Sequence, residues 1–119
     1  MANLIPKAVG PYSPYRVVGD YIFVSGQIGL NPETNELVEG VEAQAKQSLT
    51  NIKNILKTEG LDMSNVVKTT VLLADIKSFV PVNEIYATFF TEPYPARSAF
   101  AVKDLPKGAL VEIEVIAHK

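Results

Sequence analysis

The chain of 119 residues contains no cysteine. It therefore has no disulfide scaffold, no thiolate zinc site, no catalytic cysteine and no thiol redox chemistry of its own. Histidine is almost as scarce, because the single His118 lies next to the last residue. A Ser-His-Asp triad or a histidine-based metal site would depend on a side chain that we expect at an exposed, fraying end. Catalysis by this chain must therefore be sought in other residue types.

An excess of charge of either sign is also missing. The 11 basic and 13 acidic side chains give a formal charge of −2, whereas nucleic-acid-binding domains are usually basic. The one place for a modest basic surface is a predicted helix that carries Lys46, Lys53 and Lys57. Apolar runs such as residues 71–74 are much too short to cross a bilayer, and the N-terminus lacks the features of a signal peptide. We expect a single cytoplasmic domain over residues 1–119, with no membrane or nucleic-acid partner.

The periodicity of the apolar residues predicts an α+β fold in the order strand, strand, helix, strand, helix, strand, strand. One apolar stripe from Val41 to Leu56 predicts a first helix, and a second stripe predicts a helix that Ser78 caps. Strands are predicted over residues 15–18, 21–28, 65–75, the segment that follows Arg97, and 109–117.

Both predicted helices are expected on one face of a sheet, which leaves the other face without a cover. Residues 65–75 are apolar at consecutive positions, which is typical of a strand with little solvent on either face. Self-association would bury the second face, so we expect an oligomer.

Arg97, one of only two arginines, lies between a proline-rich turn and an apolar strand. Pro93 and Pro95 stiffen the backbone that leads to it, and a guanidinium suits bidentate binding of a carboxylate. The simpler alternative is a surface arginine paired with a nearby acid. Because the other arginine, Arg16, adjoins a different turn, a small monocarboxylate fits better than a dicarboxylate or polyphosphate ligand.

In the last predicted strand, Glu112 and Glu114 point away from the face of the branched apolar residues. A solvent-facing pattern is the simpler explanation. Burial of that face at a subunit contact would instead raise the pKa of a glutamate and let it transfer a proton near neutral pH. An arginine that binds a carboxylate and a glutamate that moves protons suffice to hydrolyse an imine, because water attacks that electrophile directly.

Other candidate residues come from three places in the chain. Gly26 inside a strand indicates a bulge or a close approach to the backbone, which makes Ser25 and Gly26 a second candidate site. Tyr12, in an extended arm over residues 3–14, covers either a ligand pocket or the core. Asn83 adjoins the apolar stripe of the second helix, a position more typical of a boundary residue than of a ligand.

Over nearly its whole length the chain resembles the RidA family of reactive-intermediate deaminases. The order of several matching segments, rather than any one of them, makes the resemblance specific. The segments are residues 9–13 (VGPYS), 24–28 (VSGQI), 44–49 (QAKQSL), 67–71 (VKTTV), 82–83 (VN) with Tyr86 and residues 89–90, 94–98 (YPARS) and 111–114 (VEIE).

The resemblance implies a chorismate-mutase-like α+β fold of the bacillary type, with two helices on one face of a mixed sheet. It implies a homotrimer whose sheets line a central barrel and whose clefts lie between subunits. The implied activity is that of a 2-iminobutanoate/2-iminopropanoate deaminase without cofactor or metal. Such an enzyme hydrolyses 2-aminoacrylate and 2-aminocrotonate, released by pyridoxal-phosphate enzymes, to 2-keto acids and ammonia.

By the same resemblance, Arg97 would bind the substrate carboxylate, and Glu112 would position water and transfer protons. Residue 99 would contribute its backbone, so the alanine that replaces the cysteine of many members leaves activity intact but removes thiol-based regulation. The implied substrate-binding residues are Tyr12, Ser25, Gly26, Asn83 and Ala99. Two alternatives remain, since some relatives are described as endoribonucleases or translation inhibitors, and a chaperone-like or keto- or imino-acid-binding module would bind without turnover.

Overall fold

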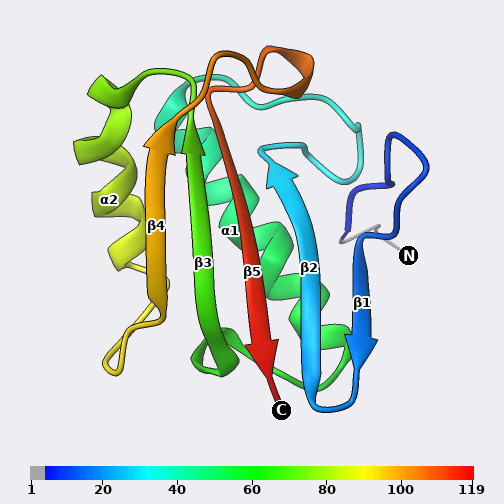
Figure 1. Ribbon diagram of the computed structural model, residues 1–119. Coiled ribbons are helices and arrows are strands. Elements are labelled where there is room, and N and C mark those ends of the chain that lie inside the picture. Colours follow the sequence, from blue (N-terminus) through cyan, green and yellow to red (C-terminus); the bar gives the residue numbers. More distant parts are fainter. Residues whose placement is uncertain (1–4) are drawn as a thin grey trace.

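One mixed sheet of five strands forms the frame of the computed structural model, which describes residues 5–119 (Figure 1). The strand order is β1-β2-β5-β3-β4, and all neighbours are antiparallel except β3 and β4. The strands are β1 (Tyr15–Val18), β2 (Tyr21–Ile28), β3 (Val66–Leu73), β4 (Ala96–Ala101) and β5 (Val111–His118). The predicted fold class and element order are confirmed, whereas the first two residues of the predicted arm lie outside the described residues.

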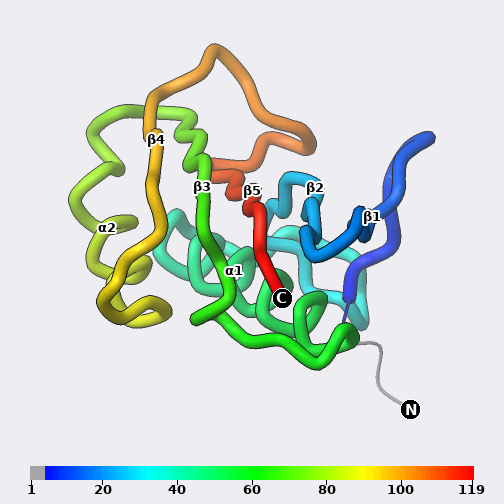
Figure 2. The backbone as a smooth tube through the Cα atoms, turned by 60° about the horizontal axis from the view of Figure 1, so that its bottom comes forward, coloured from blue at the N-terminus to red at the C-terminus, as the bar shows by residue number. Residues whose placement is uncertain are grey.

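The two α-helices, α1 (Val41–Thr58) and α2 (Phe79–Ala87), pack beside each other on the same face of the sheet (Figures 1 and 2). Glycines with positive φ bound α1 on both sides, at Gly40 and Gly60. The buried stripe that the sequence predicts for α1 is fully enclosed at Ala45, Leu49, Ile52, Ile55 and Leu56. These side chains form one core with the inward-facing residues of the sheet.

The predicted cap of α2 is wrong in detail. Ser78 precedes α2 but has helical backbone angles and makes no capping hydrogen bond. Instead, the Asp75 side chain accepts a hydrogen bond of 2.9 Å from the Lys77 amide and caps a short 3₁₀ turn, Ile76–Ser78. Because that turn leads directly into α2, the chain is already helical at Ser78 and lacks the extended geometry that a side-chain cap requires.

The last strand alternates as predicted, with Val111, Ile113 and Val115 buried toward the helices and Glu112 and Glu114 on the opposite face. His118 is exposed as expected, but it does not lie in a fraying end. It pairs with Tyr21 in the β2–β5 ladder, and the two rings meet edge to face with centroids 4.8 Å apart.

The face of the sheet opposite the helices, here called the open face, has no second layer in the single chain (Figure 2). The expectation of little solvent on either side of β3 is therefore wrong for the chain by itself. Lys68, Thr70 and Leu72 are only half-buried on this face, and Val67, at an irregularity in the β3–β5 register, is exposed. Large apolar side chains from β2 and β4, Tyr21, Phe23 and Phe100, are exposed as well.

The end of β2 passes very close to α1 at Gly29. A Cβ atom at this position would lie 2.6 Å from Gln44 Cα and 2.8 Å from Gln44 O, which are backbone atoms and cannot turn aside. The absence of a side chain at residue 29 therefore sets how closely β2 and α1 approach.

We predict that Gly29→Ala lowers the free energy of unfolding by about 1–3 kcal/mol, because the added methyl group overpacks a backbone contact. Gly10→Ala is the matched control, since its Cβ would meet only ring carbons of Tyr12 at 3.5 and 3.6 Å. Urea unfolding at one fixed protein concentration measures both variants. Equal stability of the two would contradict the close-packing argument.

Candidate active site

The predicted site residues fall into two groups that the single chain does not bring together. Cross-strand partners point to the same face of a sheet. Arg97 pairs with the fully buried Thr69, so it faces the helices, whereas Glu112 pairs with Leu72 and faces the other way. Tyr12, Ser25 and Gly26 line a pocket with Glu112, and Asn83 and Ala99 line a hollow with Arg97. These are called the glutamate pocket and the arginine pocket below.

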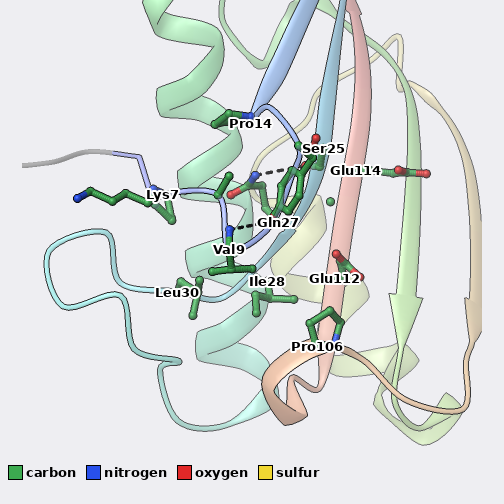
Figure 3. Close-up of a pocket in the computed structure, with 14 residues that line it drawn as sticks. Lys7, Val9, Pro14, Ser25, Gln27, Ile28, Leu30, Pro106, Glu112 and Glu114 are labelled. Atoms are coloured by element: carbon green, nitrogen blue, oxygen red, sulfur yellow. Dashed lines mark hydrogen bonds between the residues drawn. The ribbon is translucent and has the colours of Figure 1, made fainter.

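The glutamate pocket is a cavity of about 380 Å³ between the N-terminal arm, the end of β2, the start of β5 and Pro106 (Figure 3). The arm is tied to β2 at Ser25, whose hydroxyl donates to Ser13 O at 2.6 Å and whose amide donates to Pro14 O at 3.0 Å. Within the arm, the Tyr12 hydroxyl accepts a hydrogen bond of 3.4 Å from the Val9 amide. Tyr12 lines the glutamate pocket and is exposed, so it does not cover the core.

Glu112 reaches the backbone of β2 at Gly26. The β2–β5 register shifts between Val24 and Gln27, so Ser25 and Gly26 form an irregularity in the ladder. A Cβ atom at residue 26 would lie 2.9 Å from the Glu112 carboxyl carbon, so only glycine admits this contact without displacing the glutamate. The predicted bulge and close approach at Gly26 are both confirmed.

The Glu112 carboxylate has no hydrogen-bond or ion-pair partner among residues 5–119. Burial raises the pKa of Glu112 above its ordinary value, and the negative charge of Glu114 on the same strand face raises this pKa further. A carboxylate in this state is a better proton acceptor than an exposed one, as a general base requires.

Three polar side chains of α1 form hydrogen bonds with the backbone near the glutamate pocket. They were not identified from the sequence. The Ser48 hydroxyl donates to Gln27 O at 2.5 Å, and the Asn51 amide donates to Leu30 O at 2.9 Å. The Gln44 side chain accepts from the Leu110 amide at 2.8 Å. All three are buried polar residues that lie beside the apolar stripe of α1, and that sequence pattern was the available signal.

In the arginine pocket, the guanidinium of Arg97 is surrounded by uncharged groups. Its Nη1 donates to Asn83 Oδ1 at 2.6 Å, and its Cζ lies 4.8 Å from the ring centroid of Tyr86 and 5.4 Å from that of Phe79. Arg97 is exposed, as the alternative of a surface arginine required, but within residues 5–119 it forms no ion pair with a carboxylate. Ala99 packs against the core beside it.

Elsewhere, a cavity of about 400 Å³ is lined by Arg16, Lys68, Thr70 and Glu114. Lys46 and Lys53 of α1 line a shallow depression together with Asp62 and Phe89, so basic and acidic groups are mixed there. The described part of the chain contains no group of three or more histidine, aspartate or glutamate side chains placed to bind a metal ion. In the same residues, no helix is long and apolar enough to span a membrane.

Comparison with known proteins gives consistent matches over the whole chain. The family model described as Endoribonuclease L-PSP matches residues 3–119. The human 2-iminobutanoate/2-iminopropanoate deaminase is 53% identical over 113 residues, which cover 94% of this chain and 82% of the human protein. The crystal structure of RidA from the Antarctic bacterium Psychrobacter sp. PAMC 21119 superimposes with a TM-score of 0.96 at 45% identity, covering 100% of this chain and 97% of RidA. TdcF from Escherichia coli with bound serine gives a TM-score of 0.92 at 40% identity, covering 98% and 94% of the two chains.

We predict that Glu114→Gln lowers the pKa of Glu112, because removal of the neighbouring negative charge favours ionisation of the buried carboxyl group. Carbon-13 NMR of labelled glutamate side chains follows the titration directly. Glu42→Gln, an exposed position at the start of α1, is the control and should leave the midpoint unchanged. An unchanged midpoint in Glu114→Gln would show that the two carboxyl groups do not interact.

Proposed function

The chain belongs to the Endoribonuclease L-PSP family, and from this membership we propose that it is an imine deaminase. It hydrolyses 2-iminobutanoate and 2-iminopropanoate, with their enamine forms 2-aminocrotonate and 2-aminoacrylate, to 2-keto acids and ammonia. The observation that carries the proposal is that relatives named for this reaction share 53–55% of residues over 94% of the chain. An arginine without an acid partner and a glutamate with a raised pKa support it.

The reaction needs one anion receptor and one proton carrier. Arg97 binds the substrate carboxylate through its N–H groups, which fixes the imine carbon in place. Glu112 accepts a proton from water as the water oxygen forms a bond to that carbon, and the imine nitrogen becomes an amine. Glu112 then returns this proton to the nitrogen, which gives a carbinolamine. It next takes the hydroxyl proton of the carbinolamine and passes it to the nitrogen, so that the C=O bond forms as the carbon–nitrogen bond breaks and the 2-keto acid and ammonia leave. Water supplies both protons that the nitrogen gains, and Glu112 transfers them. Because water itself is the nucleophile, the chain needs no nucleophilic side chain.

The two pockets face opposite sides of the sheet, so we place the complete site between two copies of the chain. Arg97 of one copy meets Glu112 of the next, with the β4 and α2 side of the first against the arm and β2 of the second. This contact joins different surfaces, and we propose that the rotation between successive copies closes it into a ring. The exposed apolar residues of the open face support burial between copies, and a homotrimer with sheets around a central barrel is the assembly we propose.

The other site residues then have separate tasks. Tyr12 lines the glutamate pocket and closes it from the arm side, and Gly26 lets Glu112 lie against the β2 backbone. The hydroxyl of Ser25 is already bonded to Ser13 O, so we assign Ser25 to holding the arm rather than to direct binding of substrate. Asn83 orients the guanidinium, and Ala99 offers its backbone beside it.

We predict that Arg97→Lys and Glu112→Gln each reduce deaminase activity by about 10²- to 10⁴-fold, the usual contribution of a positioned acid–base or charge-binding group. A pyridoxal-phosphate dehydratase generates 2-aminoacrylate from serine, and the loss of 2-aminoacrylate is followed with and without the protein. Glu42→Gln is the matched control and should retain activity. Binding of 2-oxobutanoate without turnover in the intact protein would instead indicate a sensor, and salt-sensitive RNA cleavage would indicate a ribonuclease.

Mixing chains that lack the Arg97 guanidinium with chains that lack the Glu112 carboxylate tests whether the site is shared between copies. If Arg97 and Glu112 come from different copies, refolded mixtures of Arg97→Ala and Glu112→Gln chains contain sites in which both residues are intact. Random mixing in equal amounts should restore about one quarter of the activity, because a site needs one chain of each kind in the right order. If the site lay within one chain, no site in the mixture would contain both an intact Arg97 and an intact Glu112, and the mixture would stay inactive.

A further inference from the structure

Among the residues that the structure describes, Arg97 has no acid partner, but two aromatic rings lie beside its guanidinium. Both rings lie within the distance at which a guanidinium is attracted to a ring face, at 4.8 Å for Tyr86 and 5.4 Å for Phe79. We infer that Phe79 and Tyr86 are positioning residues that hold Arg97 for the substrate carboxylate without occupying any of its N–H donors. The inference rests on the proposed function, in which Arg97 binds that carboxylate.

The chemistry of the contact explains why rings suit this task. A carboxylate partner would occupy the donors at the edge of the guanidinium and would compete with the carboxylate of the substrate. An aromatic ring attracts the cation through the negative charge on its face and takes no N–H donor. Asn83 accepts a single hydrogen bond from Nη1, at 2.6 Å, so the other donors remain for a ligand.

Tyr86 is itself fixed by the sheet. It is 6% exposed, its hydroxyl shares a buried hydrogen bond of 2.8 Å with Thr69 Oγ1, and its ring stacks on Phe90 with centroids 4.5 Å apart. Thr69 is also the cross-strand partner of Arg97 in the β3–β4 ladder. The pairing of Arg97 with Thr69, the hydrogen bond between Thr69 and Tyr86, and the contact between Tyr86 and Arg97 together restrict the position of the guanidinium.

The simpler explanation is that Tyr86 and Phe79 only fill the core. Phe90 separates the two explanations, because it belongs to the same core, is 5% exposed and packs on Tyr86, but makes no ring contact with Arg97. A core role predicts similar effects for substitutions at Tyr86 and Phe90. A positioning role predicts that only Tyr86 and Phe79 alter the affinity for the carboxylate.

The test compares Tyr86→Leu, Phe79→Leu and Phe90→Leu in the deaminase assay and in binding of the product 2-oxobutanoate. Loss of either ring that contacts Arg97 should raise KM and the product dissociation constant by about 3- to 10-fold, as expected when a charged side chain must be ordered on binding. The kcat value should stay within about twofold, because the reacting atoms and Glu112 are untouched. Phe79→Tyr should restore the affinity because it keeps the ring, whereas Tyr86→Phe keeps the ring but loses the hydrogen bond to Thr69 and should restore the affinity in part. Phe90→Leu should leave the affinity unchanged.

A spectroscopic readout makes the test independent of turnover. The chain has only two arginines, so nitrogen-15 NMR shows two Nε–H signals, and Arg16→Lys assigns them. In the wild type the Arg97 signal should carry a ring-current shift that Tyr86→Leu removes and Phe90→Leu keeps. This readout also reports on Tyr86→Leu if that variant binds too weakly for kinetics.

Two outcomes would overturn the inference, and they differ. A wild-type protein that neither consumes 2-aminoacrylate nor binds 2-oxobutanoate would show that the proposed function itself has failed. A wild-type protein that does both, while Tyr86→Leu and Phe79→Leu keep its KM or Phe90→Leu raises KM equally, would show that the rings are core residues alone.

Discussion

Side chains alternate along a pleated strand, and the position of both candidate catalytic residues depends on that alternation. Because Val111, Ile113 and Val115 must face the helices to complete the core, Glu112 has to face the other way. Arg97 pairs with Thr69 across β3 and β4, so it faces the helices. A slip of one residue in either strand would exchange these faces and expose the core, so stability and the placement of the site are specified together.

Close approach at two glycines converts this arrangement into a pocket. At Gly29 the end of β2 meets the backbone of α1, and at Gly26 the same strand admits the Glu112 carboxylate. Hydrogen bonds from α1 side chains to backbone oxygens of Gln27 and Leu30 hold the segment between these contacts. Burial at this position is the larger cause of the rise in the pKa of Glu112, and the charge of Glu114 is the smaller one.

The charged groups of the two pockets, Glu112 and Arg97, have different surroundings. Glu112 lies near another carboxylate, which favours its protonated form, and it has no counter-ion among the described residues. Aromatic faces attract the guanidinium of Arg97 without occupying its donors. In the assembly proposed above, a substrate that carries a carboxylate and a basic nitrogen complements both pockets.

The elements, the alternation of β5, the bulge at Gly26 and the candidate residues could be predicted from the sequence, because each depends on local spacing or on the conformational needs of a single residue type. The sequence also carried the family resemblance, through ordered motifs such as residues 94–98. The cap of α2 was not predicted, because Asp75 and the short 3₁₀ turn before α2 take the place of a cap at Ser78. The ordering of His118 and the exposure of Val67 depend on neighbours distant in the chain. Strand order and register are set by packing between distant segments, so it was the fold that placed Arg97 and Glu112 on opposite sides of one sheet and brought Tyr86 and Phe79 to the guanidinium.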